Sequence, residues 1–167
     1  MESVNTIIAE QIPRLRHYAR ALTGNRASAD DLVQDTLERA WSKLHMWRRG
    51  SDMRAWMFSI MHNAFMNLVR KNQLVTTAMD DDAFEVAAPS TTGDSLEMRD
   101  LAAAIARLPH EYREVVLLIG LEQMQYEEVA QVLGLPLGTV MSRLSRGRER
   151  LRALLIEEST PVLRRVK

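Results

Sequence analysis

The chain contains no cysteine and no apolar run that approaches the ~20 residues needed to span a bilayer. Without thiols it cannot form a disulfide, a thiolate metal site or a cysteine nucleophile, which fits a reducing compartment. Near its start, Glu2 and Glu10 flank Ile7 and Ile8, which is not the charge pattern of a signal peptide. We therefore expect a cytoplasmic protein with no membrane insertion.

Motifs of catalysis are also missing. The four histidines lie apart without metal-ligand spacing, and the chain has no phosphate-binding glycine loop, no GxSxG and no HExxH. Carboxylates on helix faces or in a linker are far more often surface or capping groups than catalysts. We therefore expect a protein that is not an enzyme and that carries no metal and no cofactor.

A net charge is lacking as well, because 22 Lys and Arg residues balance 22 Asp and Glu residues. This balance alone argues against nucleic-acid binding. The charges are, however, segregated: residues 48–73 hold five basic residues and one acidic residue, and residues 137–167 hold eight and three. Between them, residues 79–100 hold seven acidic residues and one basic residue. This pattern predicts two separate anion-binding surfaces.

What the chain does have is helical periodicity. Apolar residues spaced by three and four predict a first helix that ends near Gly24. Ser28 and Asp31 resemble a capping box at the start of a second helix, and a third runs from about Met53 to Arg70. No strand-like alternation of useful length occurs. The fold class is therefore predicted to be all-α, beginning with a three-helix bundle.

Linker composition divides the chain into two small helical domains. Periodicity fails after Val75, and Asp80, Asp81 and Asp82 precede a stretch rich in Ala, Pro, Ser, Thr and Gly. Four further helices follow, with ends predicted before Pro109, near Gly120 and before Gly134. The predicted boundaries are 1–74 for the first domain, 75–97 for an acidic, flexible linker, 98–157 for the second domain and 158–167 for a tail.

The last two predicted helices, joined through residues 134–137, match a helix-turn-helix, in which the first helix braces a second that enters the major groove. Guanidinium groups on the second helix suit phosphates and guanine edges, and small hydroxyls allow close approach. A solvated basic face is the plain alternative, but the preceding helix and the glycine turn favour DNA. The candidate DNA-binding residues are Thr139, Ser142, Arg143, Ser145, Arg146, Arg148 and Arg150.

The sequence from Tyr126 to Leu151 closely resembles region 4 of extracytoplasmic-function (ECF) sigma factors. The resemblance implies that this helix reads the promoter's minus 35 element. Two residues depart from the family pattern. Gln125 replaces the usual Ser or Thr cap, and Gly147 replaces the usual Ala. Because Gln caps poorly and Gly costs up to ~1 kcal/mol within a helix, this helix is expected to depend on packing or DNA for its order.

The segment from Asp30 to Trp41 resembles region 2.2 of the same family, which implies docking on the clamp helices of RNA polymerase core. An acidic helix face suits arginines on a partner, although a solvated surface is the common role of such a face. The candidate core-binding residues are Asp31, Gln34, Asp35 and Glu38.

The third predicted helix and the segment before it resemble regions 2.3 and 2.4, which implies opening of the minus 10 element and capture of a flipped base. Basic residues beside aromatic ones suit single-stranded DNA. Trp41 and Trp56 are expected in the core, whereas Trp47 is as compatible with base stacking as with packing. The candidate residues are Trp47, Arg48, Arg49, Ser59, Asn63, Asn67, Arg70 and Lys71.

The resemblance implies an ECF sigma factor that starts transcription of a stress-responsive or signal-responsive regulon. Its implied partners are core RNA polymerase, through the beta-prime clamp helices and the beta flap, promoter DNA, and an anti-sigma factor. For the acidic linker it implies a path through the RNA exit channel, whereas composition alone indicates a tether. Two other classes stay open: a helix-turn-helix regulator that dimerises on a palindrome, and an interaction protein such as an anti-sigma antagonist, which would not need the arginine face.

Overall fold

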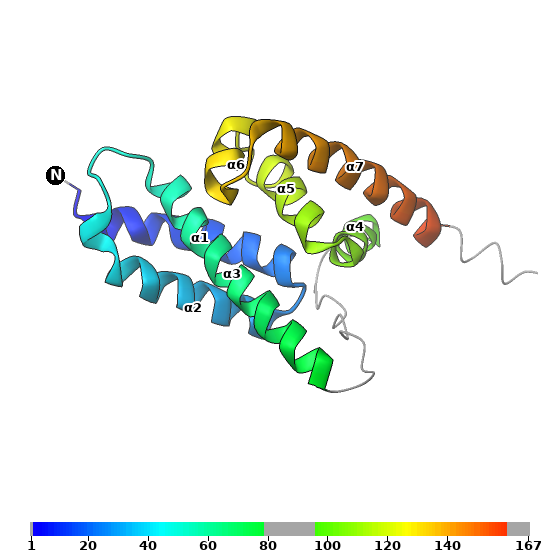
Figure 1. The fold of residues 1–167 in the computed structure, drawn as a ribbon, viewed down its shortest axis with the longest axis horizontal. Coiled ribbons are helices and arrows are strands. Elements are labelled where there is room, and N and C mark those ends of the chain that lie inside the picture. Colours follow the sequence, from blue (N-terminus) through cyan, green and yellow to red (C-terminus); the bar gives the residue numbers. More distant parts are fainter. Residues whose placement is uncertain (1, 79–95, 160–167) are drawn as a thin grey trace, which may run out of the picture.

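The computed structural model describes residues 2–78 and 96–159, and within these ranges every regular element is a helix (Figure 1). The predicted all-α fold is therefore confirmed. In those ranges, no helix is long and apolar enough to cross a membrane. The elements are α1 (Val4–Thr23), α2 (Arg26–Ser42), the short 3-10 helix η1 (Leu44–Met46), α3 (Met53–Ala78), α4 (Leu96–Arg107), α5 (His110–Gly120), α6 (Tyr126–Leu133) and α7 (Leu137–Ser159).

Local residues explain where the first helices begin and end. The Ser3 hydroxyl accepts a hydrogen bond from the Thr6 amide at 3.3 Å and starts α1, and Gly24 ends it in the left-handed conformation with φ of 69°. The predicted cap at Ser28 is wrong. Asn25 caps α2 instead, because its Oδ1 accepts from the amides of Ala27 and Ser28 at 2.8 and 3.2 Å. The helix therefore begins at Arg26.

Large apolar side chains from all three of the first helices fill the first domain. Leu15 and Leu22 of α1 are fully buried, and the Tyr18 ring meets the Phe58 ring edge to face at 5.1 Å between centroids. The prediction that Trp41 lies in the core is wrong. Trp41 lies in the last turn of α2 and is 50% exposed. The sequence identifies an aromatic side chain here, but not whether another segment packs over it.

The helices extend into both ends of the predicted linker. α3 continues past Arg70 to Ala78, and α4 begins at Leu96, so residues 75–78 and 96–97 are helical. The three aspartates of the linker lie outside the described residues, as does the tail after Ser159. The prediction that the next helices end before Pro109 and at Gly120 is confirmed.

The second domain ends in the predicted helix-turn-helix, made by α6 and α7. Gly134 has φ of 64°, and its amide donates to the Ala130 carbonyl, so the chain leaves α6 through a left-handed residue. Gln125 makes no side-chain cap for α6, as its identity predicted. The buried residues Val129, Val132 and Val140 hold the two helices together around a shared core.

Gly147 is explained by packing between α7 and α5. It is buried, and a Cβ placed on it would lie 2.9 Å from Cγ2 of Val116 and 3.2 Å from Cβ of Tyr112. Val is stiff about χ1, so it cannot easily move aside. Glycine therefore allows α7 to approach α5 closely, and the packing between the two helices offsets the low helix propensity of glycine.

We expect Gly147→Ala to lower the free energy of unfolding by about 1–2 kcal/mol, since overpacking outweighs the gain of up to ~1 kcal/mol in helix propensity. Urea denaturation followed by circular dichroism measures this change. Gly138→Ala, on the same helix but with no heavy atom within 4 Å of the added Cβ, is the matched control. Its stability should be equal to or above that of the parent. A Gly147→Ala variant as stable as Gly138→Ala would show that α7 does not need this close approach.

Candidate nucleic-acid interface

The second helix of the helix-turn-helix presents a polar outer face. Val140, Leu144 and Gly147 pack inward, and the other side of α7 is exposed over its first four turns. Of the predicted residues on this helix, Ser142, Ser145, Arg146, Arg148 and Arg150 are exposed, and Thr139 and Arg143 are partly buried. The arginines cannot all point the same way, because at 3.6 residues per turn they cover about half of the helix circumference.

These residues form three lines along α7. Ser142 and Arg146 lie in the middle, on the side of the helix away from the buried stripe, where Glu149 is exposed beside them. Arg143 and Arg150 lie along one edge, and the Arg150 guanidinium stands over the Tyr112 ring at 5.6 Å from the centroid. Ser145 and Arg148 lie along the other edge. The middle line is the part of the predicted set that best suits base contacts.

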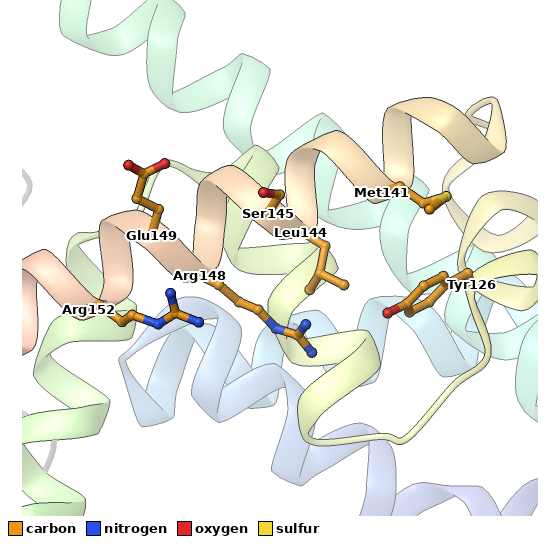
Figure 2. A pocket seen from close by; sticks show the side chains of 7 residues that line it. All are labelled: Tyr126, Met141, Leu144, Ser145, Arg148, Glu149 and Arg152. Atoms are coloured by element: carbon orange, nitrogen blue, oxygen red, sulfur yellow. The ribbon is translucent and has the colours of Figure 1, made fainter.

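The edge with Arg148 borders a surface hollow of about 460 Å³ (Figure 2). In this view Arg148, Arg152 and the Tyr126 ring extend to the same side of α7, whereas Glu149 points to the other side. Tyr126 is the first residue of α6, so the hollow joins both helices of the motif. Sequence reasoning missed Tyr126 and Arg152. The (i, i+4) spacing of the two arginines was the available signal.

The polar stripe on α3 is present as predicted. Ser59, Asn63 and Asn67 recur every four residues on one side of the helix, with Ser59 partly buried and the two asparagines exposed. Arg70 and Lys71 are exposed and continue the stripe. One domain surface therefore offers amides followed by cations.

The structure does not gather the whole predicted minus 10 set. Arg48 and Arg49 are exposed in the loop before α3, and the first residue of that helix, Met53, lies about 25 Å from Arg70 along the helix axis at 1.5 Å per residue. Trp47 is partly buried, packs against the core, and its indole N–H is buried without a hydrogen-bond partner among the described residues. Most of the Trp47 ring is therefore used in packing against the core.

An unpredicted residue, Arg39, links two of the predicted surfaces. Its Nε donates to Asp35 Oδ1 at 3.1 Å. With the Asn67 amide oriented so that its oxygen faces α2, that oxygen accepts from both terminal nitrogens of Arg39 at 3.2 Å. The remaining candidate residues of α2, Asp31, Gln34 and Glu38, are exposed. The (i, i+4) spacing of Asp35 and Arg39 signals their pairing, but Asn67 is too distant in sequence to be found that way.

Two protein families match the two domains. Residues 8–62 match the sigma2 domain of PhyR, and residues 98–151 match sigma-70 region 4. The ECF RNA polymerase sigma factor EcfG of Rhodopseudomonas palustris (strain TIE-1) is 36% identical over 156 residues, covering 92% of this chain and 86% of that protein. The ECF sigma factor SigE of Mycolicibacterium smegmatis is 33% identical over 166 residues, covering 96% of this chain and 64% of that protein.

Solved structures agree with these matches. The sigma factor RpoE of Bartonella quintana, in a co-crystal structure with the anti-sigma factor NepR, superposes with a TM-score of 0.75 at 34% identity, covering 91% of this chain and 98% of that one. CnrH in complex with the cytosolic domain of CnrY gives 0.66 at 28% identity, covering 92% and 87%. The chain belongs to the ECF sigma factors of the sigma-70 family. Its relatives are transcription regulators and not catalysts.

Proposed function

We propose that this chain binds core RNA polymerase through the acidic face of α2 and directs it to promoters with two DNA-binding surfaces. The observation that carries the proposal is the middle line of α7, where Ser142 and Arg146 are exposed on the second helix of a helix-turn-helix. Such a helix enters the major groove, where Arg can bind guanine with two hydrogen bonds. The stripe on α3 supplies the second surface, for the minus 10 element.

The hollow beside α7 extends the minus 35 surface. When the second helix lies in the major groove, the first helix crosses the sugar-phosphate backbone. Tyr126 at the start of α6 then stands near a phosphate, with Arg148 and Arg152 on the same side. We infer that these three side chains bind backbone phosphate and set the register of α7 without reading sequence.

The contacts with polymerase are proposed from the exposed polar groups of α2. Asp31, Gln34 and Glu38 offer exposed acceptors to arginines on the beta-prime clamp helices, and the second domain is assigned to the beta flap. An anti-sigma factor is proposed as the inhibitor, because the sigma factor RpoE, of similar structure, was solved in complex with the anti-sigma factor NepR. The chain acts in the cytoplasm, controls a stress-responsive or signal-responsive regulon, and carries out no catalysis itself.

The Asn63→Ala variant is expected to slow promoter opening while leaving binding to core unchanged. Asn63 is exposed in the middle of the α3 stripe, and its amide can bind the edge of an unpaired base. Permanganate reactivity of thymines in the minus 10 element measures opening, and we expect a drop of about tenfold, the effect of roughly 1.4 kcal/mol of lost contact. Thr6→Ala, at an exposed position of α1, is the control. Unchanged reactivity in Asn63→Ala would place the minus 10 surface elsewhere.

Run-off transcription on a genomic promoter library, with core polymerase and with the chain alone, tests the function as a whole. A sigma factor gives specific transcripts only with core. A helix-turn-helix dimer would instead bind palindromic sites without core, with half-sites one helical turn apart. Specific binding without core, together with no core-dependent transcripts, would reject the proposal.

A further inference from the structure

A large apolar side chain is exposed near the start of the second helix of the helix-turn-helix. Met141 is 51% exposed in the second turn of α7, beside the exposed hydroxyl residue Ser142 and one turn after Leu137, which is 41% exposed. A single exposed methionine is common on protein surfaces, so exposure alone assigns Met141 no role. Its position on the proposed DNA-binding helix does.

Met141 lies at the end of the hollow that is away from Arg152. Both side chains line this hollow together with Tyr126 and Arg148, and Figure 2 shows Met141 near the start of α7 and Arg152 further along the helix. Met141 precedes Arg152 by 11 residues, or about 16 Å along the helix axis at 1.5 Å per residue. One end of this edge of α7 therefore carries cations, and the other end carries an uncharged thioether.

The part of α7 that holds Met141 is the part that reaches the bases. In a helix-turn-helix, the N-terminal residues of the second helix contact base edges in the major groove. The groove is about 12 Å wide and a helix with its side chains is about 10–12 Å across, so side chains beside the middle line also reach base edges. In the proposed complex, Met141 therefore faces a base next to those that Ser142 and Arg146 contact.

The chemistry of a thioether limits what Met141 can contact there. Its sulfur is at most a weak hydrogen-bond acceptor, and its long, unbranched side chain adapts to apolar neighbours. Of the groups that distinguish the base pairs in the major groove, only the C5-methyl group of thymine is apolar. Covering one of the polar groups would take it out of water without a hydrogen bond, which costs free energy. Thymine is therefore the base that Met141 favours.

We propose that Met141 is a specificity-determining residue that selects a thymine in the minus 35 element by packing against its C5-methyl group. The proposal rests on the proposed function, because it requires α7 to lie in the major groove of this element. Ser142 and Arg146 then read bases through hydrogen bonds, and Met141 reads one through apolar contact. The phosphate contacts at the other end of the hollow hold the helix in register.

Deoxyuridine tests this contact without any change to the protein, because it pairs as thymine does and lacks only the C5-methyl group. In a promoter that the holoenzyme transcribes, each thymine of the minus 35 element is replaced in turn, on either strand. Electrophoretic mobility shift gives the dissociation constant of each complex. We expect one of these replacements to weaken binding about threefold to fivefold, the effect of removing one methyl group from an apolar contact. Synthetic DNA contains no methylated cytosine, so the response comes from thymine.

Variants of Met141 show whether this residue makes the contact. Met141→Gln keeps the length of the side chain and replaces its apolar end by an amide, so its holoenzyme should bind the thymine and deoxyuridine promoters equally. Met141→Leu is apolar and should recover most of the response. Met98→Gln, at a position of α4 that is 53% exposed, is the matched control and should respond to deoxyuridine as the parent does. Circular dichroism confirms that each variant is folded.

Three outcomes would overturn the methyl contact. They are equal binding of the thymine and deoxyuridine promoters by the parental holoenzyme at every position, a minus 35 element without an A·T base pair, and a parental response that persists in Met141→Gln. Each of them leaves the proposed function in place, provided that a mutated minus 35 element still weakens binding. A parental holoenzyme that binds wild-type and mutated minus 35 elements equally would reject the proposed function and the methyl contact together.

Discussion

Holoenzyme that contains Arg146→Ala is expected to bind a minus 35 promoter about tenfold to a hundredfold more weakly, because a bidentate arginine contact to a base contributes roughly 1–3 kcal/mol of discrimination. Arg146 is exposed in the middle line of α7, opposite the buried stripe. Electrophoretic mobility shift with promoter fragments measures the change. Discrimination against a mutated minus 35 element should fall in parallel.

Two comparisons make this prediction specific. Arg16→Ala, which removes an exposed arginine from α1, should leave promoter affinity at the parental value. Arg152→Ala should weaken binding equally for wild-type and mutated minus 35 elements, since a phosphate contact carries no sequence information. An Arg146→Ala holoenzyme with parental affinity and parental discrimination would show that the middle line of α7 does not read the promoter.

Replacing Arg113 by Ala is expected to lower the free energy of unfolding by about 3–5 kcal/mol, among the largest effects of a single substitution. Its guanidinium donates to the carbonyls of Leu22, Ile105, Ala106 and Leu108 at 2.6, 3.1, 2.8 and 2.7 Å. These carbonyls end α1 and α4, so the alanine variant leaves the last turns of two helices without partners. Burial lowers the pKa of Arg113 from its ordinary value, but the group stays charged.

Urea denaturation tests the role of Arg113 against a nearby arginine. Arg107 pairs with Glu157 at 3.5 Å, but their side chains are 51% and 67% exposed, so Arg107→Ala should cost less than about 0.5 kcal/mol. Arg113→Lys should recover only part of the loss, because an ammonium group cannot reach four carbonyls in one plane. If Arg113→Ala lowers the free energy of unfolding by less than about 1 kcal/mol, the four carbonyls find other partners in the variant.

Features governed by neighbours in sequence were predictable. Helices end at Gly24 and Gly134 because glycine readily adopts the left-handed conformation, and before Pro109 because proline has no amide hydrogen to donate. The face of α7 follows from helical periodicity alone. Asn25 and Ser28 show the limit of this reasoning, because two suitable caps lay within one turn and the sequence did not determine which one would start α2.

Features governed by contacts between distant segments were not predictable. From the sequence, Gly147 only lowers the helix propensity of α7, whereas in the fold it makes room for Val116 and Tyr112 of α5. Arg113 lies 91 residues from Leu22, and His62 lies 52 from Glu114, so no local pattern links these pairs. The sequence indicated two domains with separate charges, but the surface on which they meet depends on side chains far apart in the chain.

Hydroxyl-radical footprinting of holoenzyme on one promoter tests most directly whether the chain binds DNA with two surfaces. The account predicts an upstream block of protection that is lost with Arg146→Ala and a downstream block of protection, over the minus 10 element, that is weakened with Asn63→Ala, each variant leaving the other block in place. A single palindromic block that forms without core polymerase, or loss of both blocks together in either variant, would contradict it.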